Sequence, residues 1–281
     1  MSKLLVCSEP DLPSVNMREQ LLKEGGWEEA GSEEDCNFLT KGDLCMMSTS
    51  NLHIRFDSPD KIAEKAGFKV DSVIFMSKHS AASGEPALTV HPIGNYHDND
   101  LGGRAGTLVP PCPPMMTDAL RNIARYNDME EFRVCFEVTH HGPWLDKPTM
   151  FIEIGSDERN WGNVHAAEIQ AKVIDNLSMN GEEYPTVIGI AGGHYAPRFT
   201  ELALSYKVNM GHMIPNYQLE GRDDEDILRM VKLATDATGT KMVYMHRNAL
   251  KKSVQRHVIE LIEGAGYEHV RSADLEPLNG N

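Results

Sequence analysis

Apolar residues along this chain gather in short continuous runs, and segments of helical periodicity separate these runs. A continuous run predicts a strand that is covered on both faces, because apolar and polar residues alternate where one face of a sheet meets water. Between the runs, apolar residues recur at helical spacing, as at Ala167, Ala171 and Ile174. Strands are predicted at Lys3–Cys7, Leu44–Ser48, Ser72–Met76, Ala87–His91, Arg133–Thr139, Thr149–Ile154, Thr186–Ala191 and Lys241–His246.

Helices are predicted in the intervals between these strands. Thr117 follows the proline pair Pro113-Pro114 and is the predicted N-cap of one helix. Gly211 and His212 are predicted to lie in a turn, because glycine permits tight backbone conformations. The helices are expected at Ser14–Lys23, Asp60–Ala66, Thr117–Tyr126, Val164–Leu177, Asp223–Ala237 and Ala249–Gly264.

The order of these elements predicts the fold class. Strand and helix alternate in the second half, which favours an α/β fold with three α/β/α layers and a mixed, largely parallel sheet. No internal repeat and no Gly/Ser-rich linker divides the chain, so residues 1–281 are expected to form a single α/β domain. The Gly/Pro-rich segment Gly94–Pro114 is long for a connection, and is either a functional lid or an ordered surface crossover.

Composition narrows the classes of protein. No apolar stretch approaches the roughly 20 residues of a membrane helix, and the first apolar run is too short for a signal peptide, which favours a cytoplasmic protein without a membrane partner. Five cysteines without a CxxC pair indicate reduced, buried thiols rather than a zinc ribbon. The net charge of −15 argues against non-specific binding of DNA or RNA by the whole surface but does not exclude a local basic patch. Residues 246–257 are the best candidate for such a patch, and a solvated helix face is the alternative interpretation. We expect a monomer.

Residues capable of acid–base or metal chemistry occur where the apolar strands end. In α/β sheets, ligands bind in the crevice at the carboxyl ends of the strands, so these residues are predicted to form one site and the protein to be an enzyme. The segments concerned are Ser77-Lys78-His79-Ser80, His91 with Gly94-Asn95, His140-His141-Gly142-Pro143, Gly192-Gly193-His194-Tyr195, and Glu153 inside the run Thr149–Gly155.

Two of these segments need a physical explanation. Neighbouring side chains on a strand point to opposite faces, but the Gly142-Pro143 break allows both His140 and His141 to reach one crevice. Glu153 lies among apolar residues, where an ionised carboxylate is costly unless it is paired or bound to a metal. An ion pair with Arg133 on a neighbouring strand is the alternative to a functional role.

One further pattern suggests a different enzyme class, and the motifs of several common enzyme classes are absent. His165 and Glu168 have the HxxE spacing of zinc carboxypeptidase-like enzymes, and a surface contact between the two side chains is the alternative interpretation. HExxH, GxSxG, Walker A and GxGxxG motifs are all missing, which disfavours the common metalloprotease, serine hydrolase, P-loop and dinucleotide-binding classes.

The ordered set of motifs resembles the archaeal and plant type of D-aminoacyl-tRNA deacylase, from about Lys3 to the last predicted helix. The resemblance implies hydrolysis of the ester between a D-amino acid and the terminal ribose of tRNA, zinc dependence, and a phosphorylase/hydrolase-like fold similar to peptidyl-tRNA hydrolase. The motifs are Ser77-Lys78-His79-Ser80, Leu88–Asn95, Thr139–Pro143, Phe151–Ser156, Gly192–Arg198 and Gly211-His212.

With this resemblance, the residues receive hypothetical roles. A water molecule bound to zinc ionises near neutral pH, and a neighbouring His or Glu accepts its proton. Two alternatives stay open: a zinc-dependent amidase or exopeptidase that uses His165 and Glu168, and a tRNA-binding protein without catalysis. The hypothesis assigns metal binding to His91, His140, His141, His194 and Glu153, catalysis to His140, Glu153, His194, Lys78 and His79, and substrate binding to Asn95, Tyr195, Arg198, His212, Arg247, Lys252 and Arg256.

Overall fold

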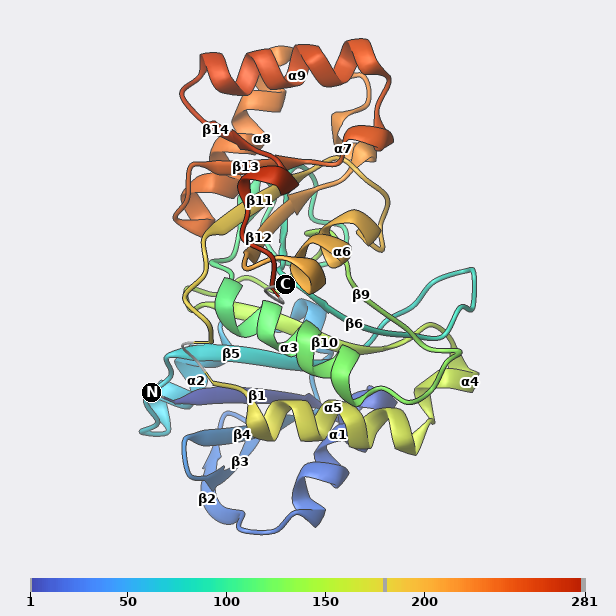
Figure 1. The fold of residues 1–281 in the computed structure, drawn as a ribbon. Coiled ribbons are helices and arrows are strands. Elements are labelled where there is room, and N and C mark those ends of the chain that lie inside the picture. Colours follow the sequence, from blue (N-terminus) through green and yellow to red (C-terminus); the bar gives the residue numbers. More distant parts are fainter. Residues whose placement is uncertain (1, 179–180, 279–281) are drawn as a thin grey trace.

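Two main β-sheets form the frame of the computed structural model, which describes residues 2–178 and 181–278 (Figure 1). The larger sheet has the strand order β2-β3-β4-β1-β5-β10-β6-β9, and the smaller one the order β12-β11-β13-β14. The strands are β1 Lys3–Ser8, β2 Glu28–Glu33, β3 Cys36–Lys41, β4 Leu44–Thr49, β5 Ser72–Lys78, β6 Ala87–His91, β9 Arg133–Phe136, β10 Thr149–Gly155, β11 Thr186–Ile190, β12 Asn209–Ile214, β13 Met242–Met245 and β14 Glu268–Val270, with a separate hairpin of β7 Gly94–Asn95 and β8 Thr107–Leu108.

Helices cover the sheets in layers. On the eight-stranded sheet, α1, α3 and α5 lie on one face and α2 on the other, while α6 and α8 with α9 lie on opposite faces of the four-stranded sheet (Figure 1). The helices are α1 Leu12–Lys23, α2 Pro59–Lys65, α3 Pro113–Tyr126, α4 Glu158–Trp161, α5 Val164–Asn176, α6 Pro197–Ser205, α7 Asn216–Leu219, α8 Asp224–Thr238 and α9 Lys252–Gly264, with 3-10 turns η1 His53–Arg55, η2 Arg247–Ala249 and η3 Ser272–Asp274.

Strand direction matches the predicted fold class. In the large sheet, β1 runs parallel to β4 and β5, and β5 runs parallel to β10, whereas β6 runs antiparallel to β10. The four strands of the smaller sheet are all parallel. The α/β class with mixed, largely parallel strands is therefore confirmed, although the strands are divided between two sheets.

Burial on both faces explains the continuous apolar runs. On β1, Leu5 belongs to the hydrophobic cluster under α1, α3 and α5, whereas Leu4 and Val6 belong to the cluster on the α2 side. The first of these clusters also includes Met213 of β12, so one apolar core contacts both sheets. That the whole chain is a single domain stays a prediction.

Some local predictions were wrong. The helix α3 begins at Pro113 and not at Thr117, because proline fits the first helical turn, where its missing N–H would have no partner. Gly211 and His212 lie inside β12 rather than in a turn. The five cysteines are free and buried, as predicted, and burial raises the pKa of the Cys7 thiol to about 11.

The segment Gly94–Pro114 is an ordered crossover that packs against the turn after His141. Leu101 lies in the loop between β7 and β8, and its carbonyl accepts the Gly142 N–H at 3.1 Å. Gly102 follows at a φ of +84°, and a Cβ added there would lie 1.8 Å from the carbonyl oxygen of Ile54. Only glycine fits this contact without a shift of the backbone.

We therefore expect Gly102→Ala to lower the free energy of unfolding by about 2 kcal/mol or more, through strained backbone and a steric clash. Urea denaturation measures the change. Gly264→Ala is the control, because a Cβ there meets nothing within 4 Å and alanine favours the end of α9. Equal stability of Gly102→Ala and the wild type would contradict the contact.

Candidate metal centre and active-site cavity

One short segment, Glu137–His141, connects the two sheets and carries three side chains of the site. It follows β9, which ends at Phe136 instead of continuing to Thr139 as predicted. Its backbone N–H groups donate to the carbonyls of Val90, His194 and Met213, at 3.0 to 3.1 Å. These acceptors lie on or beside β6, β11 and β12, so the segment is fixed between strands of both sheets.

Two further side chains come from the face of the large sheet. Glu153 lies in the middle of β10, two residues after Phe151, so the two side chains share a face. His91 ends β6 and stacks on Phe151 with 5.2 Å between ring centroids, and its Nε2 lies 3.6 Å from Glu153 Oε2. Because β6 is antiparallel to β10, the site extends over the sheet face and is not confined to the carboxyl ends of strands.

Glu137 is the centre of the cluster, and sequence reasoning missed it. Its Oε2 lies 2.8 Å from His194 Nε2, 3.1 Å from His79 Nδ1 and 3.5 Å from His140 Nε2. The side chain is fully buried, yet neither oxygen has a hydrogen bond of good geometry within the described residues. Short distances without hydrogen-bond geometry are typical of ligand atoms that converge on a cation.

Three histidines are oriented as metal ligands. The Nδ1 atoms of His91, His140 and His141 contact the backbone carbonyls of Pro92, Val138 and Gly142 at 3.1, 2.7 and 2.8 Å. A carbonyl only accepts, so each Nδ1 carries a proton, and in the neutral imidazole Nε2 then has a free lone pair. Such a second hydrogen bond is the usual partner of a metal-binding imidazole.

The candidate ligands form three overlapping groups. In each group, one nitrogen or oxygen per residue lies within 4.8 Å of the others. His91 and Glu137 each belong to two of the groups, so the candidate ligands form one continuous centre. The groups are His91, His140 and His141; His79, Glu137 and His194; and His91, Glu137 and Glu153.

Electrostatics favour the ligating protonation states at most of these positions. Burial and the neighbouring imidazoles hold the pKa of His140 well below its ordinary value and lower the pKa of His141 to about 4. Burial alone would raise the pKa of Glu137, but His194 and His79 outweigh it and keep the carboxylate ionised. His91 is the exception, because Glu153 raises its pKa against the effect of burial and so favours the protonated imidazole. Neutral imidazoles and ionised carboxylates are the forms that bind metals.

A cavity of about 340 Å³ opens beside the cluster. His79, His140, His141, Glu153 and His194 of the cluster line it, together with Asp11, His53 and Lys78. The cluster therefore faces a space large enough for a small organic group, rather than being sealed in the core.

The cavity lining also contains two residues that sequence reasoning missed, Asp11 and His53. His53 Nε2 lies 2.7 Å from Ser77 Oγ. Asp11 caps α1 through the Ser14 N–H and also accepts the Lys78 N–H, and burial raises its pKa to about 6. The Asp11 carboxylate approaches the same His53 nitrogen that contacts Ser77, at 3.9 Å, so these residues are not a serine-hydrolase triad.

Tyr195 extends the cluster on its outer side. Its hydroxyl lies 3.1 Å from His79 Nε2 and 3.3 Å from Ser156 Oγ. His79 thus lies between Tyr195 and Glu137, which is the arrangement of a proton relay. Lys78 lines the cavity and places its Nζ 4.7 Å from the ring centroid of Trp161.

Other predicted substrate-binding residues lie outside this cavity. The Asn95 amide donates to the carbonyls of Gly102 and Arg104 and holds the crossover segment. His212 is buried, and its nitrogens lie 3.0 Å from Thr139 Oγ1 and 3.0 Å from the Val109 carbonyl. Arg198 and Arg247 line a second cavity, and Lys252 and Arg256 are exposed on α9.

The structure gives the alternative partners other roles. Arg133 pairs with Glu85 at 2.6 Å and not with Glu153. His165 and Glu168 are exposed, 3.1 Å apart, and His165 also contacts Asp128. The surface-contact interpretation of the HxxE spacing therefore fits the structure.

Comparison with known proteins identifies the family. A family model described as D-aminoacyl-tRNA deacylase matches residues 66–270, which include the whole His/Glu cluster. The chain belongs to this family. The D-aminoacyl-tRNA deacylase of Methanococcoides burtonii is 36% identical over 100% of this chain, which spans 58% of that protein. The enzyme of Pyrococcus furiosus is 33% identical over 96% of this chain and 99% of its own length.

A solved structure has the same fold. The crystal structure of AF0625, described as a conserved protein of unknown function, matches with a TM-score of 0.87 and 30% identity over 98% of both chains. Together, these matches confirm the predicted family of D-aminoacyl-tRNA deacylases and the predicted α/β fold.

We expect the protein to bind a divalent metal ion through this cluster. Glu137→Gln removes the central anion and His141→Ala removes an oriented nitrogen, so each variant should bind metal at least about tenfold more weakly. Elemental analysis after equilibrium dialysis measures the bound metal. His165→Ala changes an exposed histidine outside the cluster and should retain wild-type metal content. Unchanged metal content in both cluster variants would contradict the proposed ligands.

Proposed function

We propose that this chain hydrolyses the ester bond of D-aminoacyl-tRNA and releases the free D-amino acid and tRNA. The observation that carries the proposal is the His/Glu cluster on a cavity of about 340 Å³, in a chain of the deacylase family. The aminoacyl ester is already reactive, so the site mainly has to position water and stabilise negative charge on the carbonyl oxygen.

The metal that fits this cluster best is zinc. Histidine nitrogens with one or two carboxylates are the usual donors of catalytic zinc sites, and both a three-histidine set and a set of two histidines with a glutamate occur here. Within the described part of the chain, the oxygens of buried Glu137 and the Nε2 of His91 have no hydrogen bond of good geometry, which supports a cation between them. A bound zinc ion would supply Lewis-acid chemistry, which polarises a carbonyl and makes water more acidic.

The remaining residues then have distinct tasks in the proposed reaction. Glu153 lines the cavity and accepts a proton from the attacking water. His79, between Glu137 and Tyr195, passes a proton to the ribose oxygen as the ester bond breaks. Lys78 on the cavity rim stabilises negative charge on the carbonyl oxygen or an adjacent phosphate.

Selection of the D-enantiomer requires the cavity to reject one placement of the side chain. A site does this by a steric clash or by leaving polar groups unpaired in the wrong complex. We propose that Asp11 and His53 make this selection, because both line the cavity, both lie outside the set of candidate metal ligands, and both side chains are held by hydrogen bonds.

The alternative functions have less support. The amidase or exopeptidase hypothesis depended on His165 and Glu168, which form an exposed contact away from the cavity. A tRNA-binding protein without catalysis leaves the buried, metal-like arrangement of Glu137 without a role.

The cellular setting follows from the substrate. Among the described residues, no helix has the length and apolarity needed to cross a membrane. We propose that the protein acts on aminoacyl-tRNA in the cytoplasm, where translation uses this substrate. The expected monomer stays a prediction.

The purified protein should deacylate D-Tyr-tRNA at least about 10²-fold faster than L-Tyr-tRNA, because only one enantiomer places its ester at the cluster. Release of the labelled amino acid measures both rates. Chelation should remove the activity, and added zinc should restore it. Equal rates on the two enantiomers would indicate a general esterase, whereas full activity of the metal-free protein would contradict the zinc-dependent site alone.

His140→Ala and His194→Ala should each lower turnover by roughly 10²-fold or more, as expected for lost acid–base or metal-binding groups. The double variant should lose little more than either single variant, because members of one catalytic unit are not additive. Thermal melts of the same variants test for loss of fold. Independent losses that multiply in the double variant would place the two histidines in separate roles.

A further inference from the structure

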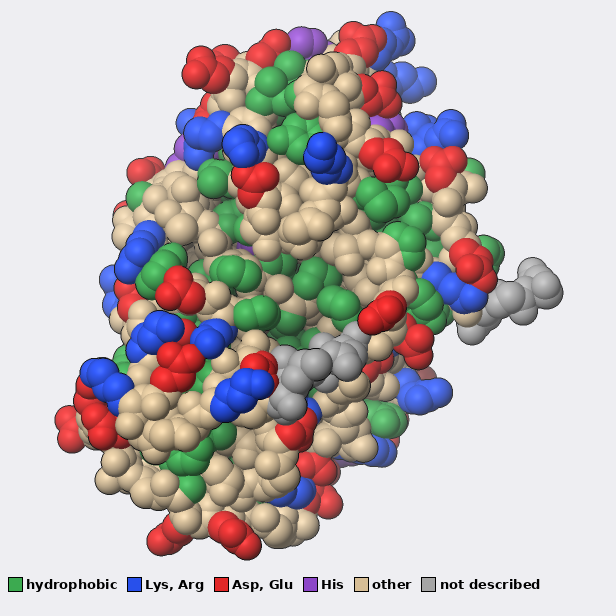
Figure 2. Space-filling view, turned by 90° about the vertical axis from the view of Figure 1, so that its left-hand side faces the viewer, with side chains coloured by type: hydrophobic (Ala, Val, Ile, Leu, Met, Phe, Trp, Pro, Cys, Tyr) green, Lys and Arg blue, Asp and Glu red, His purple; other side chains and the backbone are tan. Residues whose placement is uncertain are grey.

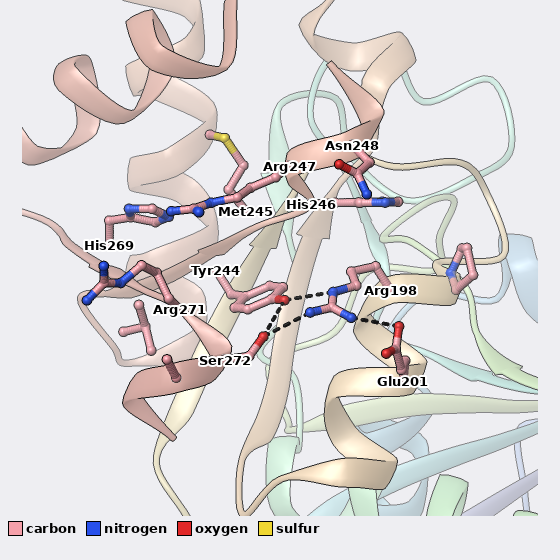
Figure 3. Close-up of a pocket in the computed structure, with 13 residues that line it drawn as sticks. Arg198, Glu201, Tyr244, Met245, His246, Arg247, Asn248, His269, Arg271 and Ser272 are labelled. Carbon is pink, nitrogen blue, oxygen red and sulfur yellow. Dashed lines mark hydrogen bonds and ion pairs between the residues drawn. The ribbon is translucent and has the colours of Figure 1, made fainter. Parts of the chain in front are cut away.

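A second and larger cavity lies at the edge of the four-stranded sheet. It has a volume of about 720 Å³ and is formed by the segments after β13 and β14 together with the start of α6. Figure 3 shows side chains from these three segments, with Arg198 among Tyr244, Ser272 and Glu201. Because β13 and β14 are parallel, the cavity lies at their carboxyl ends, where α/β sheets bind ligands.

Arginine is the main charged residue in this cavity, which we call the arginine cavity. Arg198, Arg247 and Arg271 line it, and Glu201 is its only lining carboxylate among the described residues. His246 also lines the cavity, and burial and the nearby Arg198 lower its pKa, so it adds no charge at neutral pH. The cavity is therefore positive in a protein with a net charge of −15.

The three arginines differ in how they are held. Arg198 donates to the hydroxyls of Tyr244 and Ser272 at 2.8 and 2.9 Å and pairs with Glu201, so its guanidinium is fixed (Figure 3). Arg271 pairs with Asp274, which lies outside the cavity lining.

Arg247 is the least compensated of the three. It is exposed, and within the described residues no carboxylate lies within ion-pair distance of it. A planar guanidinium with free donors suits a phosphate group better than a neutral ligand, because it donates two parallel hydrogen bonds.

The arginine cavity is a neighbour of the metal centre. Strands β11 and β13 are adjacent and parallel, and the chain after β11 carries His194 into the cluster while the chain after β13 carries Arg247 into the arginine cavity. His194 and Arg198 are four residues apart in the sequence, a span of at most about 14 Å in extended chain. Phosphates along one nucleic-acid strand rise by about 3.4 Å each, so this span corresponds to about four nucleotides or fewer.

We propose that the arginine cavity binds backbone phosphates of the tRNA 3′ strand, a few nucleotides before the esterified ribose, while the ester lies in the metal cavity. This inference rests on the proposed deacylase function. On the face drawn in Figure 2, basic and acidic side chains are interspersed, so a confined group of arginines is a better phosphate site than that surface as a whole. Lys252 and Arg256, predicted from sequence as tRNA contacts, line neither cavity.

The test compares Arg247→Ala and Arg271→Ala with the wild type on D-Tyr-tRNA. Each variant should raise KM about tenfold and leave kcat within about twofold, because a phosphate contact binds ground state and transition state alike. The slope of log KM against log salt concentration should fall by about 0.7 for each lost phosphate contact on a single strand. Arg247→Lys should restore part of the affinity. The matched control is Arg125→Ala, which removes an exposed arginine of α3 that lines neither cavity.

A phosphate-free substrate separates the arginine cavity from the ester site. On the D-tyrosyl ester of adenosine, both variants should have the kcat/KM of the wild type. An unchanged KM on tRNA, or an equal loss on the adenosine ester, would overturn the proposal. Fluorescence anisotropy measures the binding of uncharged tRNA and so tests the arginine cavity in the absence of any reaction. Wild-type protein that binds tRNA through Arg247 but releases no D-tyrosine would refute the deacylase function and leave the phosphate site standing.

Discussion

The backbone hydrogen bonds of the segment Glu137–His141 are the constraint on which the rest of the site depends. Through them, one short piece of chain is shared by the two sheets, with acceptors on or beside β6, β11 and β12. A change in the position of either sheet would move Glu137 relative to His79 or His194, and the short distances between their side chains leave little tolerance. The apolar core that reaches from Leu5 to Met213 keeps the sheets in place, so ordinary packing sets the geometry of a polar centre.

This centre also shows how buried charges are tolerated. Glu137 and Glu153 are both buried, which by itself disfavours their ionised forms, and the imidazoles around them reverse that effect on the pKa. Removal of one partner would leave an uncompensated charge in the core, which is far more unfavourable than loss of an exposed contact such as that between His165 and Glu168. The cluster is therefore a unit in its electrostatics as well as in its geometry.

Much of the fold was predictable from sequence, because strands buried on both faces give unbroken apolar runs such as Val73–Met76. The strands β2 and β3 were not identified, since exposed residues such as Glu28 and Glu29 hide the strand pattern. The segments that carry His79, His91, His140, Glu153 and His194 were predictable for the same reason as the strands before them. Glu137 was missed although it lies inside the predicted strand Arg133–Thr139, as Glu153 lies inside the run Thr149–Gly155. Asp11 and His53 were missed because only the tertiary fold brings them to the cavity.

The order of the site along the chain has a consequence for folding. His79 and Tyr195 are in contact although 116 positions separate them, and β6 must pair with β10 across the whole Gly94–Pro114 crossover. Contacts between such distant segments form only after the intervening chain has closed a large loop, which is entropically unfavourable. The cluster thus assembles late, and a nascent chain that has not yet been synthesised beyond Tyr195 has only part of it. The complete site therefore requires the chain to be synthesised at least as far as Tyr195 of its 281 residues.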